Sequence, residues 1–438
     1  MEQHDATHDS ALAYARDLGE FVQNVPSSFH TSAAIAQLLT KRGFVVLDER
    51  DHWSIESGGC YGVVRDGAVI AWTVPTGVDA AAGFRVIGAH TDSPGFKVKP
   101  APEIFAHGWQ QLGVEIYGGP VLTSWLDREL SIAGRVLTRD GAQHLVHTGP
   151  VARIPHLAIH LDRTLRDMTK LDPQRHTQPI VATALTESGT LVEHLAHIAD
   201  CQPRDVVSWD LVLADTQAPQ VFGLRNEFLA AGRLDNLSSV FAALSAVTAK
   251  ADELLDVAHI TVIAAFDHEE VGSASRSGAA GSLLEDVMSR VTQALGFTDS
   301  DRRRALAGSV LISADAGHGV HPNYPEAHDP VVRPHLSGGP MLKVNADQRY
   351  TSDAVSSALW HRWCDQAGVT GQVFVSHNAV PCGSTIGPLV ETRLGMRSVD
   401  VGVPLLSMHS ARELAHVKDL LALRDVLAAA VTDTRPAG

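Results

Sequence analysis

Residues 84–95 read FRVIGAHTDSPG, and this stretch decides the fold. The first six residues, Phe84 to Ala89, form a short apolar run, which predicts a buried strand. The run ends abruptly in a polar loop that carries His90 and Asp92. Because ligand sites in open α/β sheets form at the carboxyl ends of strands, we expect a functional site here.

The chain around this strand alternates between strand-like and helix-like segments. The expected helices are 9–23, 31–39, 236–255, 281–295, 353–367 and a C-terminal helix, and the expected strands are 68–74, 259–266, 309–316, 372–378 and 398–404. Such alternation predicts an α/β fold, with a mixed sheet flanked by helices on both faces.

Between about residues 97 and 229 the pattern changes, with frequent Gly and Pro and the strand-like pieces GVEIYG, LSIAGRVL, HLAIHL and WDLVLAD. A chain of 438 residues exceeds one ordinary core, so two domains are expected. We assign residues 1–96 and 233–438 to the main α/β domain, and 97–232 to an inserted β-rich domain.

Composition excludes several classes of partner. The formal net charge is −15, which repels phosphate backbones and anionic lipid at long range, so neither nucleic acid nor a membrane is expected as a partner. Four scattered cysteines indicate neither a disulfide framework nor a thiolate metal site. With no signal-peptide pattern and no long apolar run, the sequence predicts a cytoplasmic protein.

Candidate metal ligands follow several of the expected strands or begin the helix after one. They are His90, Asp235, Glu270, Asp315 and His409. Two imidazoles with three carboxylates suit Zn2+, Co2+ or Mn2+, and one carboxylate can bridge two ions through its two oxygens. We assign the bridging role to Asp235, which stands alone in the tight polar turn GRLDN at the head of a helix.

Two further acidic residues are assigned to the chemistry. Glu269 adjoins Glu270, so one carboxylate can bind metal while the other stays free to accept a proton, and Glu269 is the predicted general base of a hydrolase. Asp92, two residues after His90, is placed to accept the imidazole N–H and fix the tautomer of the ligand.

Structural alternatives exist for each residue alone. A single buried histidine such as His90 is usually a hydrogen-bonded core residue, and Asp235 could be an N-cap. Glu269 and Glu270 could form a solvated helix N-terminus, Asp315 and His318 could be turn residues, and His409 could cap the C-terminal helix. Their joint recurrence at strand ends favours a site. Other catalytic patterns, including HExxH, Gly-x-Ser-x-Gly, Walker A and GxGxxG, are absent from the sequence.

Nine segments in order resemble the motifs of one family: GAHTDSPG, RIPHLAIHL, LADTQ, RLDNL, EEVGS, SADAGHGVHPNY, KVNADQRY, PCGSTIGP and MHSARE. With these the sequence resembles the M18 metallopeptidases, the aspartyl aminopeptidases, over nearly its whole length. The resemblance implies a zinc-peptidase domain with two metal ions, preferably Zn2+, and a second domain for dimerisation. It also implies a homo-oligomer, a dodecamer, that removes Asp or Glu from peptides with an acidic N-terminus.

The resemblance also implies residue roles. His90 and Asp315 would bind one metal, Glu270 and His409 the other, and Asp235 both. His318 and Tyr350 would lie near the substrate, Lys343 would face its acidic side chain, and His160 would reach a neighbouring subunit's site. For His160 a structural role stays open, because HLAIHL also predicts a strand with His156 and His160 on one face. One departure is His268, where the family pattern favours Asn.

Three functions are therefore compared. The first is a metal-dependent aminopeptidase for acidic N-termini. The second is a related two-metal carboxypeptidase or deacylase on the same core. The third is a catalytically silent scaffold of the same fold. The intact ligand set argues against the third, and the substrate terminus separates the first two.

Overall fold

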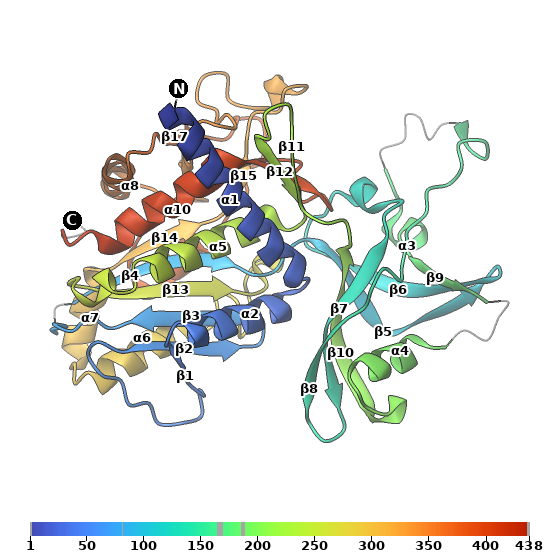
Figure 1. Cartoon of the computed structure of the whole chain (residues 1–438), viewed down its shortest axis with the longest axis horizontal. Helices are drawn as coiled ribbons and strands as arrows, with labels where there is room; N and C mark the ends of the chain where they lie inside the picture. Colours follow the sequence, from blue (N-terminus) through green and yellow to red (C-terminus); the bar gives the residue numbers. More distant parts are fainter. Residues whose placement is uncertain (1, 81, 164–169, 185–188, 436–438) are drawn as a thin grey trace.

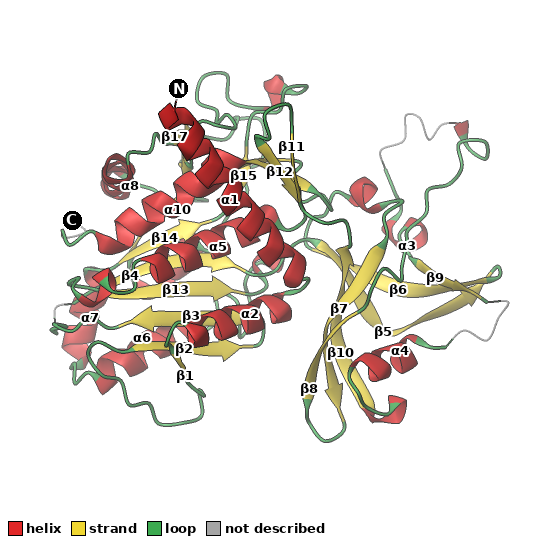
Figure 2. Cartoon of the chain, viewed as in Figure 1, coloured by secondary structure: helices red, strands yellow, loops and turns green. Residues whose placement is uncertain are grey.

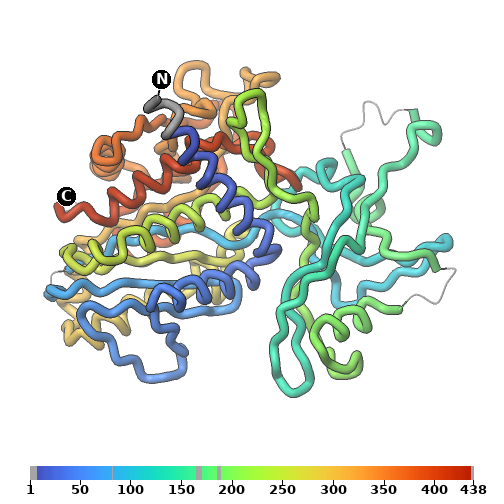
Figure 3. The backbone as a smooth tube through the Cα atoms, in the orientation of Figure 1, coloured from blue at the N-terminus to red at the C-terminus, as the bar shows by residue number. Residues whose placement is uncertain are grey.

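The computed structural model of the chain describes residues 2–80, 82–163, 170–184 and 189–435. Figure 1 shows a large α/β part with a smaller β-rich part beside it. Both ends of the chain lie on the large part (Figure 3). The fold class is α/β, as predicted, with several sheets flanked by helices.

The large part is built on a nine-stranded sheet with the order β1-β2-β3-β13-β4-β14-β18-β16-β17. Its strands are β1 (Val45–Val46), β2 (Cys60–Arg65), β3 (Ala68–Thr73), β13 (Ile260–Phe266), β4 (Phe84–His90), β14 (Val310–Ala314), β18 (Arg397–Gly402), β16 (Met341–Lys343) and β17 (Gln372–Phe374). The central strands β13, β4, β14 and β18 run parallel, whereas β3 and β16 pair antiparallel with them. The sheet is therefore mixed, as expected.

The two faces of this sheet are buried in separate cores, because alternate residues of each strand point to opposite faces. Ile87 and Ile263 belong to one core and Val86 and Val262 to the other. The first core is covered by α1 (Glu2–Asn24), α2 (Ser28–Lys41), α5 (Leu234–Ala249), α8 (Ala354–Ala367) and α10 (Val417–Thr432). The second is covered by α6 (Leu283–Ala294), α7 (Asp299–Ala307) and α9 (Gly387–Leu394). Figure 2 shows α1, α5 and α10 lying across one face.

The smaller part is an antiparallel six-stranded sheet with the order β8-β7-β10-β5-β6-β9. Its elements are β5 (Gly95–Ala106), β6 (Trp109–Tyr117), β7 (Leu130–Thr138), β8 (Gln143–His147), β9 (Ile180–Thr183) and β10 (Val206–Asp215), with helices α3 (Pro173–His176) and α4 (Leu191–Ile198). The core of this part includes Phe96, Ile132 and Leu211.

A third sheet joins segments that are distant in sequence, in the order β11-β12-β20-β19-β15. Its strands are β11 (Gln220–Phe222), β12 (Phe228–Ala231), β20 (Glu413–His416), β19 (Pro404–Leu406) and β15 (Gly317–His318). The sequence predicts the insertion at 97–232, but its last strands lie outside the six-stranded sheet, since β11 pairs with β12 and β12 pairs with the C-terminal β20.

The strand predicted for HLAIHL is wrong. Residues 156–158 have no regular structure and residues 159–161 form a turn. The alternating apolar side chains of this segment, Leu157, Ile159 and Leu161, are 52%, 45% and 74% exposed. The apolar alternation suggested a half-buried strand, but no strand of the described chain pairs with the segment and no core covers it.

The two parts contact each other through charged side chains. Arg135 on β7 donates to Asp66 over 2.7 Å, in the turn between β2 and β3. The same guanidinium lies 4.3 Å from the ring centre of Phe29 on α2. Arg276 donates to the other oxygen of Asp66. Asp66 thus links the β-rich part to the loop that follows β13. None of the described helices is long and apolar enough to cross a bilayer.

His259, immediately before β13, gives a testable pH dependence. Burial, reinforced by Arg85, lowers the pKa of His259 to about 3, and its Nε2 lies 3.0 Å from the Val431 carbonyl at the end of α10. The folded state therefore binds fewer protons than the unfolded state below the ordinary histidine pKa of about 6.5. We expect the free energy of unfolding to fall as the pH falls from about 6.5 towards 3, by at most about 1.4 kcal/mol per pH unit from this group.

In His259→Gln, which keeps an N–H donor towards Val431, this slope should become shallower in urea denaturation at a series of pH values. The exposed His361 on α8 supplies the matched control, His361→Gln, which should leave the slope as it is. Equal slopes in the wild type and in His259→Gln would contradict the assignment.

Candidate metal centre

The site forms where neighbouring parallel strands end together. His90, the last residue of β4, pairs in register with Phe266, the last residue of β13. On the other side of β4, β14 ends at Ala314, directly before Asp315. The loops after three adjacent strands therefore begin at one edge of the sheet, and their polar side chains converge there.

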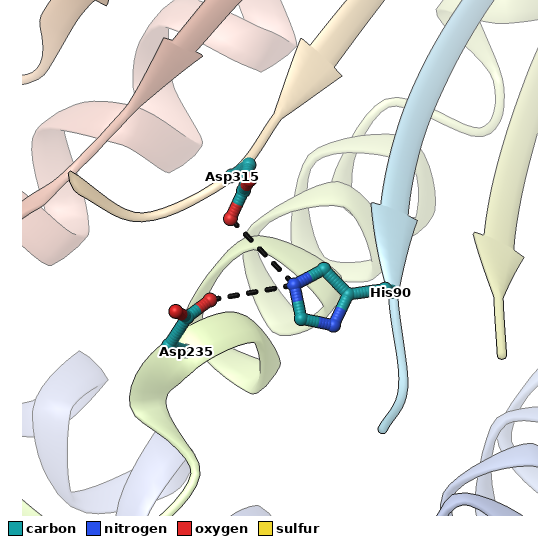
Figure 4. Close-up of side chains that lie close together, drawn as sticks. All are labelled: His90, Asp235 and Asp315. Carbon is teal, nitrogen blue, oxygen red and sulfur yellow. Dashed lines mark ion pairs between the residues drawn. The ribbon is translucent and has the colours of Figure 1, made fainter. Parts of the chain in front are cut away.

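One group of ligand atoms lies around His90 (Figure 4). The His90 Nε2 lies 3.4 Å from Asp235 Oδ1 and 3.6 Å from Asp315 Oδ1. The three side chains come from β4, from the start of α5 and from the loop after β14, and all three are buried. Asp235 and Asn236 have non-helical backbone angles within α5, and the peptide bond between them is cis.

A second group lies on the other side of Asp235. His409 Nε2 is 3.3 Å from Asp235 Oδ2 and 3.6 Å from Glu270 Oε1. Asp235 therefore presents one carboxylate oxygen to each group. Glu269 also belongs to the cluster, because it offers an oxygen within 4.8 Å of ligand atoms of His90 and Glu270. All five predicted ligands and the predicted base are thus brought together.

The donor set fits divalent metal ions. Asp235 Oδ1 is buried and makes no hydrogen bond with any residue that the structure describes, which is costly unless a cation or another donor satisfies it. Burial and neighbouring carboxylates raise the pKa of Glu269 to about 7 and that of Glu413 to about 8, and burial with Asp235 raises the pKa of Glu270 as well. Burial opposes protonation of His409, but Asp235 and Glu270 raise its pKa to about 10. This concentration of negative charge, with imidazole and carboxylate donors, suits zinc.

Asp92 supports the glutamate pair. Its Oδ1 accepts from the backbone N–H of Glu269 over 3.0 Å, and its Oδ2 accepts from that of Glu270 over 3.1 Å. Tyr117 on β6 donates to the same Oδ2 over 2.8 Å. The acceptor nearest to His90 Nδ1 is the Asp92 backbone oxygen at 3.1 Å, with the carboxylate at 3.4 Å. Asp92 therefore orients His90 and both glutamates at once.

Glu413 supports two further ligands, Asp235 and His409, a role that sequence reasoning missed. Its Oε2 accepts from the N–H of Asp235 over 2.9 Å and its Oε1 from the N–H of His409 over 2.8 Å. Glu413 is the first residue of β20 and is almost fully buried. The only signal in the sequence is its place four residues after His409 in MHSARE, which does not reveal its partners.

The ligands line a cavity of about 470 Å³ that also contains three of the predicted substrate-binding residues, His318, Lys343 and Tyr350. Lys343 is 2% exposed and its ammonium donates to the Ala316 carbonyl over 2.8 Å. The same ammonium lies 5.3 Å from the ring centre of Tyr350. Burial lowers the pKa of His318 to about 4, so this imidazole is neutral at physiological pH. The Lys343 ammonium also forms an ion pair with Asp315 Oδ2 over 3.7 Å, so it places a basic group beside the predicted metal ligands.

His160 lies elsewhere. It is exposed in the turn at 159–161 of the β-rich part and does not line this cavity within the described chain. His268, where the family pattern favours Asn, has a left-handed backbone with φ of 63°. Asn tolerates this conformation better than most residues. In this chain the His268 ring is held by Ser275, whose hydroxyl lies 2.8 Å from Nδ1.

Comparison with known proteins identifies relatives along nearly the whole chain. Residues 21–429 match the family model described as aminopeptidase I zinc metalloprotease (M18). A protein named probable M18 family aminopeptidase 2, from Streptomyces avermitilis, is 49% identical over 416 residues, covering 94% of this chain and 96% of the relative.

Solved structures are also similar to this chain over nearly its whole length. A chain in the cryo-EM structure of the Ape4 and Nbr1 complex superposes with a TM-score of 0.94 at 34% identity, covering 97% of this chain and 86% of that one. A chain in the structure of the S. cerevisiae mApe1 dodecamer superposes with a TM-score of 0.83 at 29% identity, covering 95% of each chain.

The position of Glu413 predicts an effect on metal affinity. In Glu413→Gln one carboxylate oxygen becomes an NH2 group, which faces a backbone N–H and cannot accept from it. The backbone of Asp235 or His409 should then shift, and zinc affinity should fall roughly 10- to 100-fold, as is usual when a group behind a metal ligand is lost. Competition with a zinc-binding fluorescent chelator measures this change.

Asp419 on α10 provides a matched control. It is also a buried carboxylate that accepts two backbone N–H groups, from Ser337 over 2.7 Å and Gly339 over 2.8 Å, but it does not line the metal cavity within the described chain. Asp419→Asn should lower stability and leave zinc affinity unchanged. If the two variants bind zinc equally, Glu413 has no special role at the ligands.

Proposed function

The chain belongs to the M18 family of zinc aminopeptidases, and we propose that it uses two divalent metal ions to remove N-terminal residues, preferably Asp or Glu, from peptides. The observation that carries the number of ions is the orientation of Asp235, whose two oxygens face two separate groups of ligand atoms. A carboxylate in this arrangement suits a bridging position between two cations.

The proposed metal sites follow from these groups. His90 and Asp315 would hold one ion, Glu270 and His409 the other, and Asp235 both. Zn2+ is the preferred ion, with Co2+ and Mn2+ compatible with the same donors. When bound, such ions lower the pKa of water and polarise a carbonyl group.

The proposed general base is Glu269, which lines the cavity beside the ligands. Its carboxylate would take a proton from the attacking water and pass it to the nitrogen of the departing peptide. Asp92 fixes the Glu269 backbone through a hydrogen bond, so the base is held in place before substrate arrives.

The proposed acidic preference depends on Lys343. In a protein of net charge −15, an acidic side chain entering the cavity needs a local positive charge, and the buried ammonium supplies one. Tyr350 beside it and His318 on the opposite β15 strand would shape the space around the substrate. A free peptide amine would then lie towards the metal ligands.

We extend the proposal to assembly. The likeness to the mApe1 dodecamer supports self-association into a homo-oligomer, for which we propose a dodecamer. The exposed apolar residues around His160 support a contact between copies through the β-rich part, and His160 would then reach the cavity of a neighbouring copy. Four free cysteines support a cytoplasmic location.

The role of Glu269 is tested by Glu269→Gln, which keeps the shape but cannot take a proton. We expect kcat to fall roughly 10²- to 10⁴-fold while bound metal is retained, because a general base contributes that much. Turnover and metal content by mass spectrometry are measured on the same preparation. The control is Glu391→Gln, since Glu391 on α9 does not line the cavity among the described residues. Wild-type turnover in Glu269→Gln would remove Glu269 from the mechanism.

The substrate preference is tested with peptides that differ only in the first residue, with and without chelator and added metal. Peptides beginning with free Asp or Glu should be cleaved fastest, and acetylated versions should resist, because an aminopeptidase needs the free amine. Cleavage of acetylated peptides would instead indicate a deacylase. A metal-loaded protein inactive on every peptide would indicate a silent scaffold.

Lys343→Met should raise KM for acidic peptides roughly 10- to 100-fold relative to neutral ones, as expected for loss of a bond to a charged group. Lys250→Met, at the exposed end of α5, is the control and should change neither KM value. An unchanged ratio between acidic and neutral peptides in Lys343→Met would contradict the role of Lys343.

A further inference from the structure

Asp400 on β18 is a buried carboxylate outside the metal-ligand group. It is fully buried, and no basic side chain of the described chain forms an ion pair with it. Among the described residues, its oxygens accept hydrogen bonds from hydroxyl and backbone N–H groups. Burying a charge without a counter-charge is unfavourable unless every lone pair is well used, so the partners of Asp400 indicate what the carboxylate does.

One set of partners lies next to the substrate cavity. Asp400 Oδ2 accepts from the Thr351 N–H over 2.6 Å and from the Thr351 hydroxyl over 2.8 Å. The backbone N–H of Asp400 donates to the Ser352 hydroxyl over 2.9 Å. Residue 350, directly before this pair, is the tyrosine whose ring faces the Lys343 ammonium in the cavity. Asp400 therefore anchors the segment that presents Tyr350.

The other Asp400 oxygen binds the part of the cavity wall formed by residues 383–385. Asp400 Oδ1 accepts from the Thr385 hydroxyl over 2.5 Å, and Thr385 lines the cavity together with Gly383 and Ser384. The start of α9, just after Thr385, also packs directly on the Asp400 carboxylate. A Cβ atom at Gly387 would lie 2.7 and 2.8 Å from the two Asp400 oxygens, closer than real Cβ contacts, so this position needs glycine.

Two longer hydrogen bonds join the same two segments where they are exposed to solvent. Arg349 Nε donates to the Gly383 carbonyl over 3.3 Å, and the Ser384 hydroxyl donates to the Arg349 carbonyl over 3.3 Å. Both bonds are longer than the three hydrogen bonds that the Asp400 oxygens accept, which measure 2.5 to 2.8 Å. Asp400 is therefore the main tie between the two walls.

We propose that Asp400 is a positioning residue for substrate: it ties the Tyr350–Ser352 segment to residues 383–387, which lead into α9, and so fixes the part of the cavity that faces Lys343. This inference rests on the proposed function, because that part of the cavity would receive the first side chain of the peptide. Asp400 touches neither the metal ligands nor Glu269 through any hydrogen bond of the described chain. Asp400 therefore affects how the substrate fits the cavity and not the chemical step.

The first test is Asp400→Asn. The amide would keep an oxygen for Thr351, but its NH2 group could only donate to the Thr385 hydroxyl. The present bond, in which Thr385 donates, would have to reverse, so the tie to Thr385 is weakened while the side-chain volume is kept. We expect KM for the peptide that the wild type prefers to rise roughly tenfold, the equivalent of one hydrogen bond. We expect kcat and metal content to stay within about twofold, since a loss of uniform binding raises KM alone.

The second test is Thr385→Val, which removes the same bond from the other side. If Asp400 and Thr385 act through one tie, the double variant should show no greater KM than either single variant, whereas independent effects would multiply. This cycle also keeps the proposal testable should Asp400→Asn fold poorly, because the threonine variant alone should then reproduce the rise in KM.

Asp419→Asn is the matched control, a buried carboxylate bound only by backbone N–H groups and outside the cavity. It should lower the melting temperature without changing KM. A lower melting temperature with unchanged KM in both Asp400→Asn and Thr385→Val would overturn the proposal and leave Asp400 a structural residue. The proposal would also be overturned if Asp400→Asn lost kcat or bound metal by a factor as large as its rise in KM.

Measurements on the wild type distinguish a failure of this inference from a failure of the proposed acidic preference. If the peptide panel shows another preferred first residue, the acidic preference fails, and the variants are then measured on that preferred peptide. The rise in KM and its dependence on Thr385 test Asp400 in either case.

Discussion

The parallel pairing of β4 with β13 and β14 is the constraint on which the site depends. Because β4 and β13 end at the same register position, His90 and the loop that holds Glu269 begin side by side. Because β14 runs parallel on the other edge of β4, Asp315 begins from the same side of the sheet. A shift of one residue in either pairing would move a whole strand end and turn its side chains to the opposite face. The two apolar cores resist such a shift, since each accepts only alternate residues.

The loops beyond these strand ends have little regular structure, and buried carboxylates organise them. Asp92 binds the N–H groups of the glutamate pair, Glu413 those of Asp235 and His409, and Asp400 that of Thr351. Each acidic side chain replaces the partners that a strand or helix would supply to those backbone groups. The carboxylates of this part of the protein therefore have two roles. Some face the cavity, and others hold the backbone of the residues that line it.

Much of this arrangement could be predicted from the sequence. The apolar run that stops before His90 located one strand end, and the strand expected at 309–316 placed Asp315 near the end of another, although β14 stops at Ala314. The ligand types at these positions indicated a metal site. The supporting residues could not be found in this way, because the partners of Glu413 and Asp400 lie in loops whose backbone angles the sequence does not specify. His268 shows the same limit, since its left-handed backbone follows from tertiary packing. HLAIHL misled because apolar alternation predicts a strand only where a neighbouring strand and a core are present, and here neither covers the segment.

His90 and His409 come from opposite ends of the chain, and both face Asp235. The third sheet joins these ends further, because β12 pairs with β20 and α10 packs across α1 and α5. A nascent chain that has released only its first three hundred residues from the ribosome therefore has an incomplete set of donors. The predicted group of donors cannot close before residue 409 has been synthesised, so a peptidase of this design would lack its full donor set while residues up to 408 are being made.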